Sequence, residues 1–93
     1  MLFRSVGGEE FNILLPNTSP DNAANIANDL KTLIEKDAFV YDGKKIPVTI
    51  SIGVAIFEEQ KHTDLEKLLL DADSALYQAK NTGRNKVCVY SGE

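Results

Sequence analysis

The 93-residue chain has few of the residues that mark disulfide-rich or zinc-binding proteins. It contains one cysteine, Cys88, so no internal disulfide can form, which agrees weakly with a reducing compartment. It has no tryptophan and one histidine, His62, which leaves no Cys/His zinc spacing and no Ser/His/Asp arrangement. His62 stands just before a predicted helix, where a solvated loop residue is the simplest interpretation.

Basic charge and long apolar runs are also scarce. Ten Lys and Arg residues against 14 Asp and Glu give a net charge of −4 and a pI of about 4.9, which argues against a surface that coats nucleic acid. No apolar run approaches the length of a membrane span, and the first residues lack the apolar segment of a signal peptide. We therefore expect a cytoplasmic setting, no nucleic-acid polymer as partner, and membrane attachment only through missing parts of a parent protein.

The composition is that of an ordinary soluble fold, with 43% hydrophobic and 26% charged residues. A chain of this length is expected to form one domain with a small stability margin. Two short apolar runs, 2–6 and 11–15, flank a glycine-containing loop and predict a β-hairpin. A helix is expected next, because Ser19 is a good N-cap, Pro20 suits the first helical position, and apolar residues then recur at helical spacing as far as Lys36.

The middle of the chain predicts two strands. A short strand at 39–41 is followed by the turn signal Asp42-Gly43, and alternation over 46–57 predicts a longer strand. One face of the longer strand would carry large aliphatic residues and the other only small ones, which favours close packing of a helix over a ligand. The small residues are Thr49, Ser51, Gly53 and Ala55.

The last third predicts a second helix and a final strand. A capping box at 63–66 begins the helix, whose apolar stripe runs from Leu65 to Ala79. Gly83 is the expected C′ residue of that helix, and a strand over 86–90 follows. The predicted order is therefore β-β-α-β-β-α-β. It corresponds to an α+β fold with the helices on one face of a mainly antiparallel sheet.

Residues 7–10, Gly-Gly-Glu-Glu, are the first group that could carry chemistry. Two glycines permit positive φ and the close approach of a ligand, and exposed amides in such a turn can bind phosphate oxygens. Glu9 and Glu10 offer carboxylate oxygens to Mg²⁺, which often bridges substrate phosphates. On their own, however, these residues are more often a plain hairpin turn with two solvated acids.

The second group is Tyr77-x-x-Lys80-x-x-Gly83-Arg84-Asn85. Lys80 lies in the last turn of the second predicted helix, where a cation suits the helix dipole, and Gly83 is explained as the end of that helix. Neither reason accounts for Arg84. Arginine as a fork and lysine as a point charge could together clamp the β- and γ-phosphates of a nucleotide, although the spacing alone is a weak signal.

Three blocks, taken together, span nearly the whole chain. They are Arg4 with the stretch from Gly7 to Pro16, the strand from Val48 to Ala55, and the helix and turn from Asp71 to Asn85. In this order they resemble the GGDEF family, the diguanylate cyclases, in its GGEEF variant. The resemblance implies a ferredoxin-like, nucleotidyl-cyclase palm-like fold, in which residues 1–93 are the C-terminal part of a single GGDEF domain.

The resemblance also implies an activity: two GTP molecules, each held by one domain of a homodimer, are condensed into cyclic di-GMP with release of pyrophosphate. By analogy, Glu9 would bind Mg²⁺, with Mn²⁺ as an alternative, and would help to deprotonate the attacking 3′-hydroxyl. Glu10 would act electrostatically at the reacting phosphate, and Asn85 would brace the turn after the helix. The implied substrate-binding residues are Gly7, Gly8, Lys80 and Arg84.

Two departures from the family pattern matter. The family usually has one residue between the arginine and the first glycine, whereas Ser5 and Val6 both stand between Arg4 and Gly7. Such an offset turns a side chain to the opposite face of a strand, which leaves the role of Arg4 open and suggests a local bulge. The family's N-terminal half is also missing, with its first core strand, a second magnesium-binding aspartate and the guanine-reading residues. We expect the parent protein to be the enzyme and the isolated chain to be almost inactive.

Two other functions stay open. One is a nucleotide-binding regulatory module without catalysis, but such modules often lose one carboxylate of the turn, and Glu9 and Glu10 are both present. The other is an interaction or dimerisation fragment without a ligand, which the acidic composition neither supports nor excludes. Titration with GTP and magnesium separates this last function from the other two.

A sheet that lacks its first core strand would leave an edge and apolar surface uncovered. We therefore predict that the 93-residue chain, on its own, dimerises, exchanges elements between chains or rearranges. Light scattering after size-exclusion chromatography measures the mass of the species, and denaturant unfolding measures its stability. A strictly monomeric chain with the stability of a complete domain would contradict the prediction.

Overall fold

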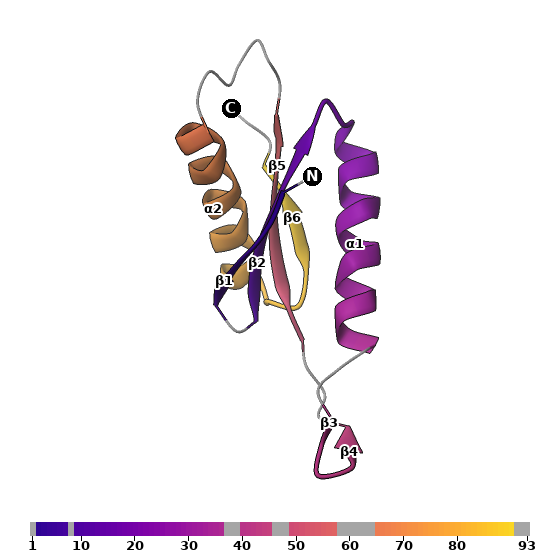
Figure 1. The fold of residues 1–93 in the computed structure, drawn as a ribbon. Coiled ribbons are helices and arrows are strands. Elements are labelled where there is room, and N and C mark those ends of the chain that lie inside the picture. The colour runs from indigo at the N-terminus through magenta and orange to yellow at the C-terminus, as the bar shows by residue number, and fades with distance from the viewer. Residues whose placement is uncertain (1, 8, 37–39, 46–48, 58–64, 91–93) are drawn as a thin grey trace.

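The computed structural model describes residues 2–7, 9–36, 40–45, 49–57 and 65–90. Its elements are β1 (Leu2–Gly7), β2 (Glu10–Pro16), α1 (Pro20–Lys36), β3 (Val40–Tyr41), β4 (Lys44–Lys45), β5 (Ser51–Phe57), α2 (Leu65–Asn81) and β6 (Val87–Val89). Four strands form one sheet in the order β1-β2-β5-β6, and β3 and β4 form a separate ribbon. Figure 1 shows the sheet between the two helices, with the ribbon extending beyond one end.

The sheet is mixed rather than mainly antiparallel. β1 and β2 pair in the antiparallel direction, whereas the β2–β5 and β5–β6 pairs are parallel. The α+β class is confirmed, but the predicted antiparallel layout is wrong for two of the three pairs in the described sheet. The reason is that a helix joins the strands of each parallel pair, and a helical crossover returns the chain to the end of the sheet where it started.

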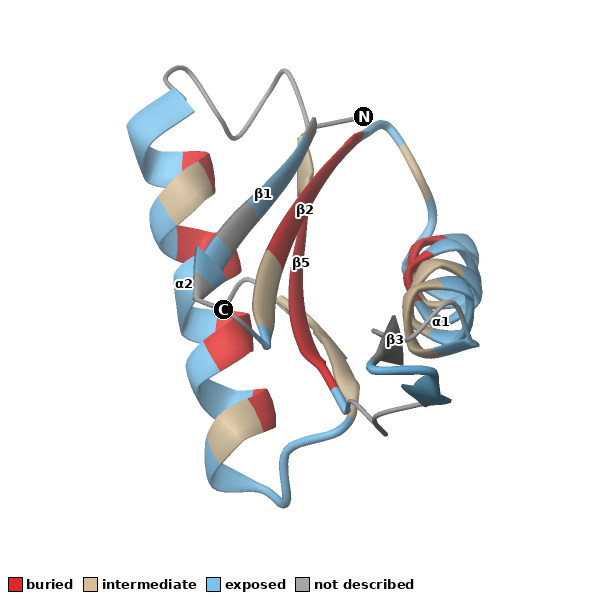
Figure 2. Cartoon of the chain, turned by 60° about the horizontal axis from the view of Figure 1, so that its bottom comes forward, coloured by how far each residue is buried: buried red, intermediate tan, exposed pale blue. Residues whose placement is uncertain are grey.

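The two helices lie on opposite faces of the sheet, not on one face as predicted (Figure 1). On one face Ala27 of α1 packs with Ile52 and Val54, and on the other Ala72 of α2 packs with Ala55. Both faces of β5 are apolar, so each needs a covering helix, and Figure 2 shows the buried side of α2 turned toward the sheet. Because the chain advances in one direction through β2, β5 and β6, the two crossovers have opposite hands. Two right-handed crossovers would have placed both helices on one face.

The small-residue face of β5 receives α2, as its sequence predicted. Gly53 is the point of closest approach. A Cβ atom at this position would lie 2.3 Å from the carbonyl oxygen of Ala72 and 2.4 Å from the backbone nitrogen of Leu76. Since these are helix backbone atoms, which cannot rotate aside as a side chain can, α2 fits against β5 only because residue 53 has no side chain.

Hydrogen bonds confirm the predicted start of α1 and the predicted end of α2. Ser19 Oγ accepts a bond of 3.2 Å from the Asn22 amide, which is the N-cap bond of α1. Gly83 follows α2 with a φ of 120°, and the Arg84 amide donates to the Ala79 carbonyl over 2.9 Å. This last bond is the 6→1 bond of a Schellman motif, so glycine ends the helix as expected.

The turn signal Asp42-Gly43 joins β3 to β4, and both of its residues have positive φ, 54° and 75°. That is the backbone of a tight hairpin turn, and it adds one strand to the predicted order. The long strand predicted over 46–57 appears as β5, which begins at Ser51. Positions 46–48 of this prediction and 63–64 of the capping box lie outside the described residues.

The contact at Gly53 gives a stability prediction. Gly53→Ala should lower the free energy of unfolding by about 3 kcal/mol, the upper end for overpacking, because the blocking atoms belong to the backbone. Gly43→Ala is the matched control: its Cβ would meet nothing within 4 Å, and its positive φ costs only about 1 kcal/mol. Urea unfolding measures both variants. If Gly53→Ala and Gly43→Ala unfolded at the same urea concentration, α2 would not pack this closely against β5.

Candidate functional site

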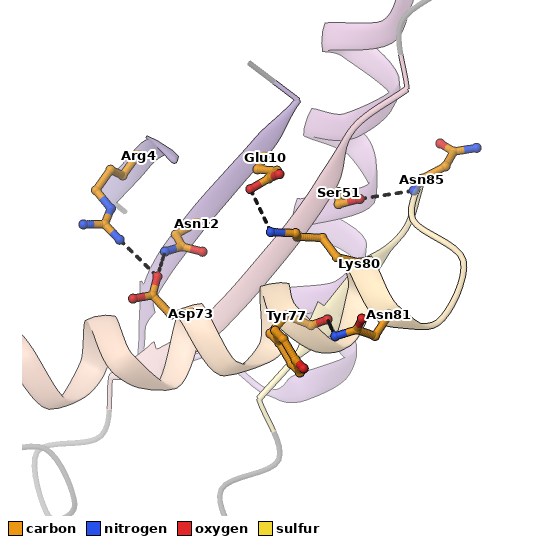
Figure 3. Close-up of polar contacts among 9 residues, drawn as sticks. All are labelled: Arg4, Glu10, Asn12, Ser51, Asp73, Tyr77, Lys80, Asn81 and Asn85. Carbon is orange, nitrogen blue, oxygen red and sulfur yellow. Dashed lines mark hydrogen bonds and ion pairs between the residues drawn. The ribbon is translucent and has the colours of Figure 1, made fainter. Parts of the chain in front are cut away.

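The start of β2, which follows the turn, and the end of α2 meet where Glu10 faces Lys80 (Figure 3). Lys80 Nζ, in the last turn of α2, lies 3.2 Å from Glu10 Oε1, at the first residue of β2. The two side chains are 31% and 25% exposed, so water screens their attraction less than it screens a fully exposed pair. The structure therefore brings together residues from the two groups that the sequence singled out.

A β-bulge in β1 accommodates the extra residue ahead of the glycines. The pairing with β2 shifts register between Ser5 and Gly7, which leaves Val6 without its own partner residue in the ladder. Arg4 lies before the bulge, and its guanidinium nitrogen is 3.1 Å from Asp73 Oδ1 on α2. The bulge suggested by the sequence is confirmed, and Arg4 connects β1 to α2.

Asn12 is a polar residue that the sequence reasoning missed. It is fully buried between β2 and α2, and its Nδ2 donates to Asp73 Oδ1 over 2.5 Å. The amide nitrogen must face Asp73, because a carboxylate can only accept. Asn12 Oδ1 is buried without a partner among the residues described. A lone amide inside the apolar run of β2 was the signal that could have found it, since buried polar groups need partners.

The remaining residues of the Gly-Gly-Glu-Glu turn are placed only in part. Gly7 ends β1, and Gly8 lies outside the described residues. Glu9 is exposed in the turn, and its carbonyl oxygen accepts a bond of 2.9 Å from the Ser51 amide. The part of the chain described here contains no cluster of three or more His, Cys, Asp or Glu side chains that could hold a metal.

The donor set at the turn nevertheless fits a hard cation. Mg²⁺ keeps several waters and uses one or two carboxylates together with substrate phosphates, so it needs no cage of protein ligands. Glu9 is exposed and forms no ion pair with the described residues, whereas one oxygen of Glu10 already faces Lys80. Glu9 is thus the better candidate for a metal ligand.

The loop after α2 has an unusual backbone. Arg84 and Asn85 both have positive φ, 58° and 48°, a conformation that costs about 1–3 kcal/mol per residue and persists only where the surroundings hold it. Two bonds do so: the Arg84 amide donates to Ala79, and the Asn85 amide donates to Ser51 Oγ over 3.2 Å. The Arg84 side chain itself is exposed and forms no ion pair within the described part of the chain, so it can face an anion.

The site thus combines the acidic end of the glycine turn with Lys80, and Arg84 follows just after the same helix. The sequence model of the family "Diguanylate cyclase, GGDEF domain" matches residues 1–86, and the chain belongs to this family. No solved structure matches the chain.

Three relatives illustrate the likeness. Diguanylate cyclase A of Treponema denticola is 45% identical over 84 residues, which cover 87% of this chain and 22% of that protein. The uncharacterized protein YhcK of Bacillus subtilis is 43% identical over 84 residues, 89% of this chain and 23% of its own length. An uncharacterized membrane protein of Staphylococcus haemolyticus, SH2145, is 38% identical over 87 residues, 92% of this chain and 24% of its own.

The chain thus spans less than a quarter of the length of these relatives. Neither helix within the described ranges has the length and apolarity that a membrane crossing requires.

The contacts of Asp73 give a second stability prediction. Asp73→Ala should cost about 1–3 kcal/mol, because it leaves the buried amide of Asn12 without an acceptor. Arg4→Ala should cost less than about 1 kcal/mol, since it removes only a half-exposed ion pair. Asp73→Asn keeps a carbonyl acceptor for Asn12 and should resemble Arg4→Ala. Denaturant unfolding measures the stability of all three variants. Equal losses of unfolding free energy for Asp73→Ala and Asp73→Asn would show that the charge of Asp73, and not its bond to Asn12, causes the effect.

Proposed function

We propose that residues 1–93 form the C-terminal part of a single diguanylate cyclase domain, which in the full-length protein condenses two GTP molecules into cyclic di-GMP. The observation that carries this proposal is the contact of Lys80 with Glu10, which joins two motifs that are 70 residues apart. The similarity to the Treponema denticola protein, which is named a diguanylate cyclase, supports the same reaction.

Lys80 and Arg84 are the proposed ligands of the terminal phosphates. The ammonium group of Lys80 has three donors, so it can keep Glu10 and still bind a phosphate oxygen. Arg84, four residues further on, offers a planar fork that matches two phosphate oxygens. Gly7 and Gly8 would let the nucleotide approach the turn without a side chain in the way.

Glu9 and Glu10 have different proposed roles in catalysis. Glu9 would hold Mg²⁺, or Mn²⁺ in its place, and accept the proton of the attacking 3′-hydroxyl. When bound, the metal ion neutralises phosphate charge in a reaction that depends on positioning more than on covalent help. Glu10 would keep Lys80 directed at the turn and shape the field at the reacting phosphate.

The reaction joins two identical substrates, so the expected partner of the domain is a second copy of itself. Each domain would hold one GTP, so the active species would be a homodimer in which the two 3′-hydroxyls attack across the interface. GTP is a cytoplasmic metabolite, and we infer a cytoplasmic setting for the domain, with any membrane attachment made by other parts of the protein.

The test is product formation from GTP and Mg²⁺ by the full-length protein. Glu9→Gln should lower the rate by about 10²-fold or more, the usual contribution of a general base. Glu66→Gln, which removes the same charge from the exposed first turn of α2, should stay within about twofold and serves as the control. Residues 1–93 alone should form almost no product.

The outcomes separate the candidate functions. A wild-type protein that binds GTP but makes no cyclic di-GMP would be a regulatory module, and one that binds no GTP would be an interaction domain. Equal rates for Glu9→Gln and Glu66→Gln would remove Glu9 from the mechanism. Robust turnover by residues 1–93 would show that the chain needs no further part of the domain.

A further inference from the structure

Ser51 connects the two halves of the candidate site, although neither motif contains it. It is the first residue of β5, is 4% exposed, and lies opposite Glu10 in the parallel pairing with β2. Its backbone nitrogen donates to the carbonyl oxygen of Glu9 over 2.9 Å. Its side-chain Oγ accepts a bond of 3.2 Å from the amide of Asn85 (Figure 3).

These two bonds act on different segments. The backbone bond to Glu9 continues the sheet and is independent of the side chain at position 51. The bond to Asn85 depends entirely on the hydroxyl group, and it holds a residue whose φ is 48°. Arg84 directly precedes Asn85, so the hydroxyl of Ser51 restrains the chain on the C-terminal side of Arg84, while the bond to Ala79 holds the amide of Arg84 itself.

We propose that Ser51 is a positioning residue for the terminal phosphates of the nucleotide: its hydroxyl holds the Gly83–Asn85 loop at a fixed distance from the Glu9–Glu10 turn. This inference rests on the proposed function. Loss of the hydroxyl removes no charge from the site and leaves Glu9 and Lys80 in place. It frees the amide of Asn85, the residue that follows Arg84, so the loss of affinity should appear only for ligands that have terminal phosphates.

The experiment compares two ligands on the full-length protein. The probes are a GTP analogue with a methylene group between the α- and β-phosphates, which cannot react, and GMP, which lacks the terminal phosphates. Ser51→Ala should bind the analogue about tenfold more weakly, the equivalent of one hydrogen bond, and GMP within about twofold of the wild type. Ser51→Thr keeps a hydroxyl and should regain most of the affinity for the analogue that Ser51→Ala loses.

Thr82→Ala is the matched control. Thr82 is exposed beside the same loop, and its hydroxyl donates to the Gln78 carbonyl over 2.6 Å, not to Asn85. Both ligands should bind this variant as they bind the wild type, within about twofold. Equal weakening of the two ligands by Ser51→Ala would mean a general structural effect and would overturn the inference.

Amide hydrogen exchange supplies a readout that needs no nucleotide. In Ser51→Ala the amide of Asn85 should exchange about tenfold faster, while the amide of Tyr90, which donates to the Val54 carbonyl, should keep its rate. Unchanged exchange at Asn85 would overturn the positioning role even if nucleotide binding fell. If the wild-type protein bound neither ligand, the proposed function would fail together with the inference, whereas normal wild-type binding with an unaffected Ser51→Ala variant would refute the inference alone.

Discussion

The close approach of α2 to β5 at Gly53 is the constraint on which the rest of the structure depends. Gly53 lies opposite Asn12 in the pairing of β5 with β2, so the helix comes near both strands at the same level. Asp73 then reaches Asn12, and Lys80, about two helical turns further on, reaches Glu10. Positions seven apart on a helix and two apart on a strand each share a face, so one backbone contact sets both polar contacts.

Apolar packing and polar contacts have separate roles in this domain. The two apolar clusters, one on each face of the sheet, supply most of the stabilisation, since each buried Val, Leu or Ile side chain contributes about 1.5–3 kcal/mol. A partly exposed ion pair such as Arg4–Asp73 contributes at most about 1 kcal/mol. Its main effect is geometric, because it links the edge strand β1 to the helix that also carries Lys80.

The sequence by itself determined the local features, which depend only on residues that are neighbours along the chain. The cap at Ser19, the turn at Asp42-Gly43 and the helix end at Gly83 each follow from the conformational preference or hydrogen-bonding capacity of a few consecutive residues. The two motifs were recognisable for the same reason, and their order along the chain indicated the GGDEF family before any contact between them was known. The extra residue beside Arg4 likewise pointed to the bulge that the structure contains.

Only the tertiary structure decided which segments meet. The parallel pairing of β2 with β5 joins residues about 40 positions apart, and no local preference encodes such a pairing. The sequence showed that one face of β5 carries large aliphatic residues and the other small ones, but this pattern does not say which helix covers which face. The partners of Asn12 and Ser51 were hidden for the same reason: a buried amide or hydroxyl in a strand shows that a partner is needed, and packing alone selects that partner.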